Sequence, residues 1–355
     1  MEVVHITSET GWRGGEIQVF NLINGLSALG VANTLICPPK SILSKKLKGV
    51  DIYELSVNHP YNPIIWNKIR KFLKSFSSPL VHIHNPDAHT LAFLSGIPGP
   101  LILHRRTIFP IKTNVLTLAK YKSLRIKKII CISDAIKKYT ASILGDKNLI
   151  TIHDGIDPSN IEMHDPHEVL CKELRISADS IIIGNASALT PEKGWELFLE
   201  ISKILTTEIP ELHFVVVGEG VLKESLKIQV TSLGISSHVH FLGFKSDIRM
   251  TISGFDILLM PSTKEGLGTV ILDAFAVQTP VVATNVGGIP ELIIHNKTGL
   301  LAELNNKSEF IQNIKILLEN ADLRNQLIKN AANHLLHFSS SSMVNKTIEV
   351  YKSVF

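Results

Sequence analysis

Residues 3–30, VVHITSETGWRGGEIQVFNLINGLSALG, decide the fold of this chain. Residues 3–7 form a short β-type run, a turn containing Gly14 and Gly15 follows, and residues 16–29 carry apolar side chains at helical spacing before Gly30. A strand joined to a helix by a glycine-rich turn is a βα unit. The segment therefore predicts the start of an α/β domain with a parallel sheet.

The alternation of strand and helix continues through the rest of the chain. Continuously apolar runs are typical of strands that crossover helices cover on both faces. In the first half, further strands are expected at residues 32–37, 80–84, 101–104, 128–132 and 149–153. A second series opens at residue 180 with SIIIGNASA; its further strands are expected at 214–218, 240–242, 257–260 and 281–284, and its helices at 194–207, 221–233 and 270–276.

These two series predict two doubly wound α/β domains of Rossmann type. The joint is expected near residues 155–168, where GIDPSNIEMHDPHE lacks a regular apolar period. We therefore place an N-terminal domain at residues 1–160 and a C-terminal domain at 161–338, and we expect a helix at 339–355 to cross back to the N-terminal domain. Two such domains would face a central cleft with the carboxyl ends of both sheets, where α/β proteins bind ligands.

Composition limits the class of protein. With 355 residues, 45% hydrophobic and 19% charged, the chain is typical of a soluble globular protein of two domains. Its N-terminus lacks the basic and apolar regions of a signal peptide, and no apolar run approaches the ~18 residues of a membrane span. Cys37, Cys131 and Cys171 lie far apart, which favours neither a disulfide framework nor a zinc site. We expect a cytoplasmic protein.

The net charge of +4 conceals an uneven distribution. Residues 1–160 contain 20 lysines and arginines against 10 aspartates and glutamates, whereas the remainder contains 16 against 22. A basic half indicates an anionic partner, which leaves open a membrane surface, a phosphate-bearing acceptor and nucleic acid. One apolar stripe in this half has two interpretations, a helix lying on an anionic membrane or a helix packed into the core. It consists of Trp66, Ile69, Phe72, Leu73 and Phe76, bordered by Lys68, Arg70, Lys71 and Lys74.

Residues 265–273, EGLGTVILD, carry the strongest chemical signal. Glu265 and Asp273 flank a glycine-containing turn and sit among apolar residues, where an unpartnered carboxylate would be costly. If a helix starts here, the backbone N–H groups of Gly266 and Gly268 converge with the carboxylates. That combination suits a ligand with phosphates and sugar hydroxyls. A surface pair of carboxylates is the alternative.

Three other turns are candidates for the same ligand. Lys193, in LTPEKG, precedes a helix, where its ammonium suits a diphosphate, although a solvated lysine on a turn has the same pattern. Gly14 and Gly15 either let the backbone approach a ligand or form a plain tight turn. Their spacing is not GxGxxG, so a dinucleotide fingerprint is not supported. Gly287 and Gly288, in TNVGGIPELI, either line another such loop or cap the following helix.

Taken in order, these motifs resemble those of a known family. EGLGTVILDA, VVATNVGGIPELI and HNKTGLL, with LTPEKG, VVVGEG and FLGF upstream, are similar to the nucleotide-sugar-binding half of the retaining glycosyltransferases of family 4, the glycosyl transferases group 1. In the first half, WRGGEIQVFNLINGLSALG, ICISDAI and IHDGID agree with that family. The similarity covers most of the chain. It implies the GT-B fold, in which two Rossmann-like domains face a central cleft.

The resemblance implies roles for particular residues. Lys193 matches the lysine that binds the donor diphosphate. Glu265 matches the first acid of the family's E-x7-E motif, which contacts the transferred sugar, and Asp273 matches the second acid, which holds the ribose. His104 matches a histidine at the sugar, although a lone histidine is often a packed or surface group. The expected catalytic residues are Glu265 and His104; the donor-binding set is Gly14, Gly15, Lys193, Glu265, Gly266, Leu267, Gly268, Thr269, Val270 and Asp273; Arg13, Arg105 and Arg106 are candidates for the phosphates or the acceptor.

Two positions depart from the family pattern. The second acid is Asp273 where glutamate is usual, so the carboxylate is one methylene shorter. Many members carry an arginine five residues before the lysine, and this chain has Ala188 there. Loss of one charge-assisted contact costs roughly 1.5–3 kcal/mol, which would weaken donor binding without abolishing it.

The motifs also imply a mechanism. Because no DxD-type metal pair or His/Asp ligand cluster lies near the expected cleft segments, we expect no cofactor and no metal ion; Lys193, backbone amides and helix N-termini would neutralise the leaving diphosphate. The resemblance implies retention of anomeric configuration. A double displacement would need a carboxylate nucleophile, and no acid of the first domain is well placed, so front-side attack fits better.

The expected function is transfer of a sugar from a nucleotide sugar to a saccharide or lipid-linked acceptor, in bacterial lipopolysaccharide or surface-polysaccharide biosynthesis. The basic half favours a peripheral position at the inner face of the cytoplasmic membrane. Two alternatives remain, a nucleotide-sugar epimerase on the same fold and a noncatalytic basic protein that binds membrane or nucleic acid. Nucleic acid is not an expected partner, because aromatic stacking platforms are not evident.

Overall fold

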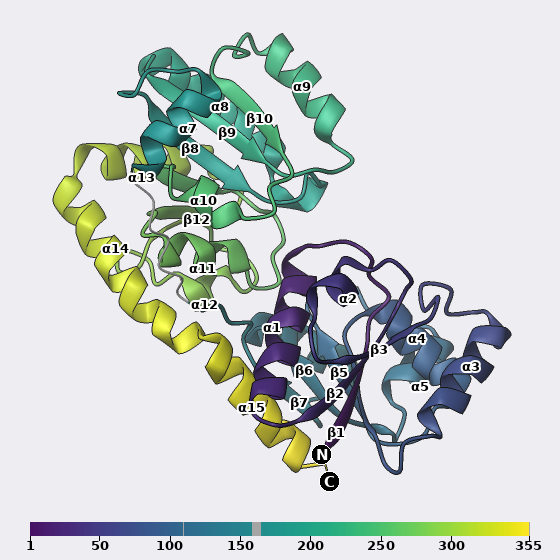
Figure 1. Ribbon diagram of the computed structural model, residues 1–355. Coiled ribbons are helices and arrows are strands. Elements are labelled where there is room, and N and C mark those ends of the chain that lie inside the picture. The colour runs from purple at the N-terminus through teal and green to yellow at the C-terminus, as the bar shows by residue number, and fades with distance from the viewer. Residues whose placement is uncertain (109, 158–164, 355) are drawn as a thin grey trace. The chain divides into compact units, whose positions relative to one another are not determined.

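A computed structural model describes residues 1–108, 110–157 and 165–354. The chain forms two compact units (Figure 1). The N-terminal unit combines Met1–Ile156 with Ser339–Phe355, and the C-terminal unit comprises Asp157–Phe338. The domain boundary expected between residues 160 and 161 lies outside the described residues.

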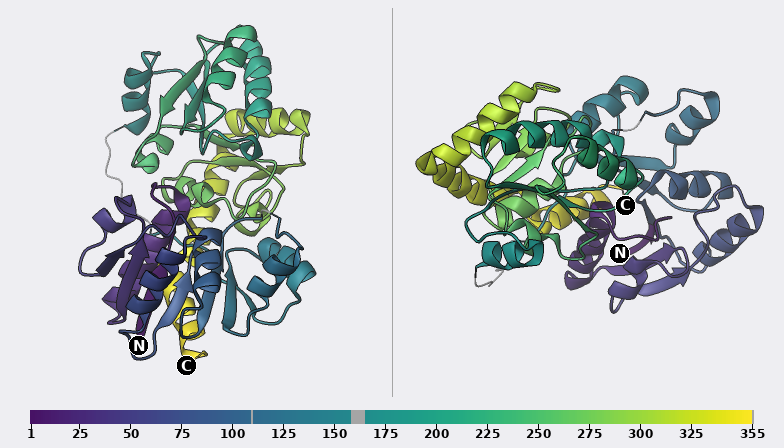
Figure 2. Two further views of the ribbon diagram at one scale, coloured as in Figure 1. Left: turned by 90° about the vertical axis from the view of Figure 1, so that its right-hand side faces the viewer. Right: turned by 90° about the horizontal axis from the view of Figure 1, so that it is seen from above.

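The N-terminal unit is built on a seven-stranded parallel sheet in the order β3-β2-β1-β4-β5-β6-β7. The order reverses between β1 and β4, which places the loops after these strands at a topological switch point. Helices cover both faces of the sheet (Figure 2). The strands are β1 (Glu2–Ile6), β2 (Ala32–Cys37), β3 (Asp51–Glu54), β4 (Leu80–Ile83), β5 (Leu101–Arg105), β6 (Ile126–Cys131) and β7 (Leu149–Thr151). The helices are α1 (Gly14–Ala28), α2 (Ile42–Lys46), α3 (Pro63–Leu73), α4 (Pro86–Ser95), α5 (Val115–Tyr121), α6 (Asp134–Leu144) and the C-terminal α15 (Ser340–Lys352).

Helix α15 packs beside α1, although more than 300 residues separate them in sequence (Figure 1). A Cβ added at Gly25 of α1 would lie 2.5 Å from Cγ2 of Val344, so the two helices approach too closely for a side chain there. Tyr351 of α15 is fully buried, and its hydroxyl lies 2.6 Å from Nδ1 of His82 in β4. The end of the chain is therefore part of the N-terminal unit's core.

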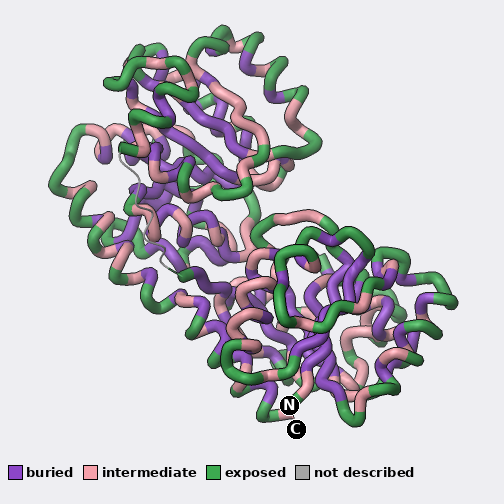
Figure 3. Tube along the Cα trace, in the orientation of Figure 1, coloured by how far each residue is buried: buried purple, intermediate pink, exposed green. Residues whose placement is uncertain are grey.

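The C-terminal unit contains a six-stranded parallel sheet in the order β10-β9-β8-β11-β12-β13. Its core surrounds Trp195, Phe198 and Phe214, and its strands other than β10 are largely buried (Figure 3). The strands are β8 (Ile181–Ala186), β9 (Leu212–Val217), β10 (Val239–Gly243), β11 (Ile257–Met260), β12 (Val281–Thr284) and β13 (Leu300–Ala302). The helices are α7 (Pro166–Leu174), η1 (Pro191–Lys193), α8 (Trp195–Glu208), α9 (Lys223–Ser232), α10 (Ile248–Ile252), α11 (Thr269–Ala276), α12 (Ile289–Leu292), α13 (Lys307–Glu319), α14 (Ala321–Leu335) and η2 (Leu336–Phe338).

The expected fold class, two Rossmann-like units with parallel sheets, is confirmed. Strands β3 and β13 and helix α10 were not expected from the sequence. The apolar stripe of α3 packs into the core, because Ile69 and Leu73 are fully buried. The ring of Phe72 stacks on that of Tyr53, with the two ring centroids 3.9 Å apart. A membrane-lying α3 is therefore wrong. Among the described residues, no helix has both the length and the apolarity needed to cross a bilayer.

Candidate functional site

Lys193 and Glu265 meet in the C-terminal unit, although 72 residues separate them in sequence. Lys193 ends the short helix η1 after β8, and Glu265 lies in the loop between β11 and α11. The Lys193 Nζ donates to Glu265 Oε2 at 2.6 Å, with 20% and 12% of the two side chains exposed. The Ser262 hydroxyl lies 3.4 Å from the same carboxylate oxygen. The two residues predicted for the diphosphate and the sugar are thus in contact.

Two glycines hold these loops together. Gly194, after Lys193, has φ +69°, and a side chain there would collide with the carbonyl of Pro261. Gly287 has φ +56°, and a side chain there would collide with the carbonyl of Glu265. The Gly288 N–H donates to that same carbonyl at 3.2 Å. Gly287 and Gly288, considered above as a ligand loop or a helix cap, therefore support the backbone of Glu265.

The segment after Glu265 leads into the N-terminus of α11. Gly268, with φ +89°, precedes the helix, which begins at Thr269. The first N–H groups of any helix lack intrahelical acceptors and attract anions. Leu267 and Val270 are buried. Of the residues predicted to bind the donor, these two therefore have only backbone atoms to offer.

Asp273 is not a free carboxylate. Its Oδ1 accepts from Nε of Arg249 at 2.8 Å, and 15% and 21% of the two side chains are exposed. Burial raises the pKa of the Asp273 carboxyl, and Arg249 opposes that shift. Arg249 also donates from Nη1 to the carbonyl of Asp157 at 3.0 Å. No sequence pattern pointed to Arg249, because α10 was not expected and no spacing links residues 249 and 273.

The position of the missing arginine lies at the carboxyl end of β8. The carbonyl of Ala188 accepts from the indole N–H of Trp195 at 2.9 Å, so the backbone there is anchored to α8. Nearby, both amide atoms of the fully buried Asn185 and the hydroxyl of Ser187 have no hydrogen-bond partner among the described residues. The apolar pattern of this segment predicted a strand but gave no indication of these buried polar atoms.

In the N-terminal unit, Arg106 is the centre of a second group. A Cβ added at Gly15, one residue into α1, would lie 3.7 Å from Cδ of Arg106. The Arg106 guanidinium pairs with the buried Asp154, and its Nη2 lies 3.5 Å from Nδ1 of His104. Burial raises the pKa of Asp154. The structure therefore brings together Gly14, Gly15, His104 and Arg106, and it adds Asp154, which lies in the quoted IHDGID segment.

The other two predicted arginines do not join this group. The side chain of Arg105 turns toward α5 and α6, where Nη1 donates to the hydroxyl of Tyr121 at 3.3 Å and the guanidinium lies 5.7 Å from the ring of Tyr139. A role of Arg105 at the phosphates or the acceptor stays a prediction. Arg13 is exposed, and its backbone N–H donates to the carboxylate of Glu16 at 2.8 Å.

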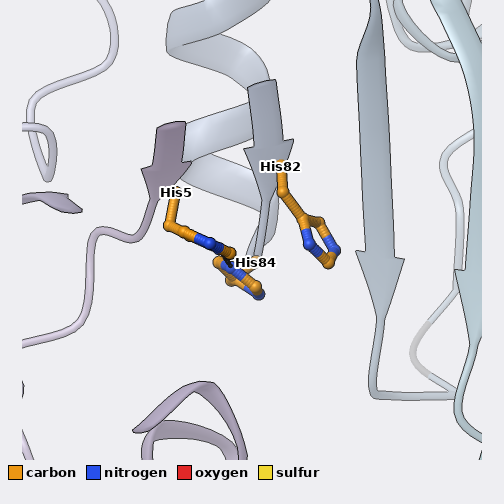
Figure 4. A group of neighbouring side chains, drawn as sticks. All are labelled: His5, His82 and His84. Carbon is orange, nitrogen blue, oxygen red and sulfur yellow. Dashed lines mark hydrogen bonds between the residues drawn. The ribbon is translucent and has the colours of Figure 1, made fainter. Parts of the chain in front are cut away.

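A buried histidine group, which sequence reasoning missed, lies beside His104. Figure 4 shows its members, His5 of β1 and His82 and His84 from β4 and its end, whose candidate ligand atoms lie within 4.8 Å of one another. Nδ1 of His5 is 2.9 Å from Nε2 of His84, and Nε2 of His5 is 3.1 Å from Oδ1 of Asn33. Burial lowers the pKa of His5 to about 4 and those of His82, His84 and His104 well below their usual value.

Neutral imidazoles are the form that binds metal, so the group has suitable donors. However, both ring nitrogens of His5 already have hydrogen-bond partners, and one nitrogen each of His82 and His84 is partnered, by Tyr351 and His5; Nε2 of His82 and Nδ1 of His84 have no partner among the described residues. No carboxylate belongs to the group, so a divalent cation would add uncompensated charge to a buried site beside Arg106. The contacts therefore favour a packing role, in which His82 stacks on His104 with ring centroids 5.3 Å apart.

Two family models match the chain. The model described as Glycosyltransferase Family 4 matches residues 12–160, and the model described as Glycosyl transferases group 1 matches residues 168–334. Together they span both units.

Curated relatives carry related names. The putative glycosyltransferase EpsD of Bacillus subtilis is 25% identical over 310 residues, covering 83% of this chain and 81% of the relative. The UDP-Gal:alpha-D-GlcNAc-diphosphoundecaprenol alpha-1,3-galactosyltransferase of Escherichia coli is 26% identical over 303 residues, covering 79% of this chain and 77% of the relative. A Campylobacter jejuni enzyme named N,N'-diacetylbacillosaminyl-diphospho-undecaprenol alpha-1,3-N-acetylgalactosaminyltransferase is 31% identical over 187 residues, covering 53% and 48%.

Solved structures share the fold. Anabaena HepE in complex with UDP-glucose superposes with a TM-score of 0.87 at 19% identity, covering 99% of this chain and 100% of that one. A glycosyltransferase from Rickettsia africae superposes with a TM-score of 0.86 at 22% identity, covering 99% and 98%. The likeness extends over the whole chain, so it concerns both units.

Proposed function

Because this chain belongs to the family 4 glycosyltransferases, which join a family 4 domain to a group 1 domain in the GT-B fold, we propose a specific reaction for it. The enzyme moves a sugar from a nucleotide-sugar donor to a lipid-linked or saccharide acceptor, with retention of configuration and without a metal ion. The contact between Lys193 and Glu265 carries this proposal, because it joins a cation and a carboxylate at the edge of the sheet beside the N-terminus of α11.

The pair can bind both halves of a nucleotide sugar. An ammonium group has three N–H donors, and the hydrogen bond from Lys193 to Glu265 uses one of them. Two donors remain for a diphosphate, and the N–H groups at the start of α11 add positive potential. The carboxylate of Glu265 keeps acceptor capacity for sugar hydroxyls. Asp273, which Arg249 fixes in place, retains Oδ2 as an acceptor for a ribose hydroxyl.

The geometry of Asp154 supports front-side attack over double displacement. A double displacement requires a carboxylate that can reach the anomeric carbon. Asp154, the acid that pairs with Arg106 beside His104, is buried. Its carboxylate is therefore committed to holding Arg106. With Lys193 and helix amides available for the leaving diphosphate, the reaction needs no metal as a Lewis acid.

The relatives suggest the class of acceptor. The names of the E. coli and C. jejuni enzymes each contain a diphospho-undecaprenol-linked sugar. We propose the same class of acceptor for this chain, in lipopolysaccharide or other surface-polysaccharide assembly at the inner face of the cytoplasmic membrane. The basic charge of the N-terminal unit suits such an anionic acceptor.

A thermal-shift panel tests the donor site. Binding to the folded state raises its melting temperature, and a ligand at 100 times its Kd adds about 2.7 kcal/mol. UDP-, GDP- and ADP-sugars should be compared for the wild type and Lys193→Met, with Lys307→Met as the control for loss of an ion-paired lysine elsewhere. We expect one nucleotide class to stabilise the wild type and the control but not Lys193→Met. No response to any of them would refute the donor site.

An assay of the responding sugar nucleotide without acceptor separates transfer from epimerisation. A transferase leaves the sugar's configuration unchanged until an acceptor is added. Conversion to an epimer in the absence of acceptor would replace the proposed reaction with that of an epimerase. With acceptor present, the anomeric configuration of the product tests retention directly.

A further inference from the structure

Helix α5 presents an unusual surface on the N-terminal unit. None of its seven residues is buried. Val115 and Leu116 are 82% and 76% exposed, and Leu124, just after the helix, is 91% exposed. Single exposed apolar residues are common, but three within ten residues form a patch. We call Val115, Leu116 and Leu124, with the cations around them, the α5 patch.

The inner side of α5 is fixed to the rest of the unit. Tyr121 packs edge-on against His89 of α4 with ring centroids 4.8 Å apart, and Nζ of Lys120 donates to the hydroxyl of Thr90 at 3.0 Å. The exposed positions 115, 116, 119 and 122 recur at intervals of three and four residues, so they share one face of the helix. The contacts of Lys120 and Tyr121 with α4 therefore fix the helix so that its opposite face is exposed. Figure 1 shows α5 beside α4 at the margin of the unit.

The stretch of chain that contains the patch carries mostly positive charge. Residues 112–128 include six lysines and arginines and no aspartate or glutamate. No carboxylate occurs anywhere in residues 88–133. Asp87, at the start of α4, is the carboxylate that acts on Lys120. Lys112, Lys122 and Lys127 are exposed. Exposed aliphatic side chains and exposed lysines, in a stretch of sequence without a carboxylate, match the headgroup and acyl layers of an anionic bilayer.

We propose that the α5 patch docks this protein on an anionic lipid surface. The aliphatic residues enter the headgroup boundary, and the lysines contact the lipid phosphates. Nucleic acid is a poorer fit, because stacking needs exposed aromatic rings and the nearest one, Tyr121, is packed on His89. For its purpose, the proposal rests on the lipid-linked acceptor of the proposed function, since docking would bring the enzyme to a membrane-held substrate.

Vesicle sedimentation of the full chain tests the patch. The probes are vesicles of phosphatidylcholine alone and of phosphatidylcholine mixed with phosphatidylglycerol. The wild type should bind the anionic vesicles, and binding should weaken with salt. In Leu116→Gln/Leu124→Gln, we expect the partition coefficient to fall about tenfold for each leucine. In Lys122→Gln/Lys127→Gln, we expect a fall of about fivefold for each lysine.

Helix α9 and the turn before it supply a matched control. Val221 and Ile228 are 83% and 71% exposed in the C-terminal unit, with charges of both signs around them in Glu219, Lys223, Glu224 and Lys227. Val221→Gln/Ile228→Gln should bind vesicles as the wild type does. Equal binding to neutral vesicles, equal losses in patch and control variants, or a patch variant that changes the oligomeric state while vesicle binding is unaltered would each overturn the proposal.

Two further readouts keep the proposal separate from the donor site. The melting temperature with the responding nucleotide sugar should rise equally in the wild type and in both patch variants, since the patch lies outside the donor-binding residues. A normal nucleotide response with no vesicle binding would reject the patch and leave the proposed function standing. A duplex oligonucleotide that displaces the protein from vesicles at equal phosphate concentration would instead assign the patch to nucleic acid and overturn the lipid proposal.

Discussion

Replacing Lys193 by methionine should separate the structural and binding roles of the Lys193–Glu265 pair. Methionine keeps the apolar stem and removes the ammonium, leaving the Glu265 carboxylate, 12% exposed, without its cation. Exposed pairs contribute about 0–1 kcal/mol, whereas removing one partner of a buried pair costs about 3–5 kcal/mol. Because the Lys193–Glu265 pair is only partly exposed, we expect Lys193→Met to lower the free energy of unfolding by about 1–2 kcal/mol. For a unit of this size, that corresponds to a fall in melting temperature of about 2–8 °C.

A double-mutant cycle isolates the pair itself. Lys193→Met, Glu265→Gln and the double variant should be compared by urea unfolding, and we expect a coupling free energy of about 1–2 kcal/mol. The control cycle is Lys307→Met with Glu200→Gln, a long-range pair at 2.9 Å whose side chains are 40% and 49% exposed. Because water screens that pair more strongly, its coupling should stay below about 0.5 kcal/mol. Equal coupling in the two cycles would refute the argument from burial.

Nucleotide affinity gives the functional half of the prediction. Losing a charge-assisted contact to the diphosphate costs about 1.5–3 kcal/mol, so Lys193→Met should weaken the Kd for the responding nucleoside diphosphate by roughly 10- to 150-fold. Glu265→Gln should bind the nucleoside diphosphate more tightly than the wild type does, because Lys193 no longer pairs with a carboxylate, and it should lose the additional affinity for the nucleotide sugar. Isothermal titration of both ligands measures this difference. A wild-type Kd in Lys193→Met would remove the lysine from the donor site.

The remaining predictions concern Asp273, the histidines and the metal. Arg249→Gln should weaken nucleotide binding about tenfold, because Asp273 loses the contact that orients it; titration of the variant measures this, and Arg249→Lys should recover part of the loss. The pKa of His5 is lowered from 6.5 to about 4, so the unfolded chain binds more protons between these values and stability should fall as the pH drops from 6.5 to 4, by about 3 kcal/mol for this group. Urea unfolding from pH 7 to 4.5 should give a flatter pH profile for His5→Gln, and an unchanged profile would contradict the assignment. Transfer should proceed unchanged after dialysis against EDTA, and restoration of a lost rate by a divalent ion would disprove metal independence.

The fold was predictable because its strands have a strong local signal. Strand β11 is continuously apolar and β12 is apolar up to its last residue; their expected bounds, like those of β2, agree with the structure to the residue. The missed strand β3 is largely exposed, with the sequence DIYE, and therefore lacks that signal. Strand β13 has only three residues, too few to show a period. Local pattern thus identifies buried elements and fails for short or edge elements.

The candidate site was predictable where one loop holds several of its groups. The segment from Glu265 to Asp273 shows its carboxylates and glycines together in the sequence. The cations that neutralise the two carboxylates come from distant segments of the sequence. One of them was predicted and the other was not. Lys193 was assigned through a motif, whereas Arg249 lies on a five-residue helix with no motif of its own. A pairing between distant segments depends on the packing of α10 against α11, which no local pattern encodes.

The two ion pairs change what the absence of an arginine at Ala188 means. With Lys193 on Glu265 and Arg249 on Asp273, the four charges cancel, so a diphosphate would enter a site with no spare cation among these four groups. Lys193 can hold it only by sharing its donors, which weakens the hydrogen bond to Glu265 and frees carboxylate capacity for the sugar. An arginine at the phosphates in addition to Lys193 would remove that competition and let nucleotide bind independently of the sugar. In this chain, recognition of the diphosphate and of the sugar is therefore coupled through one lysine.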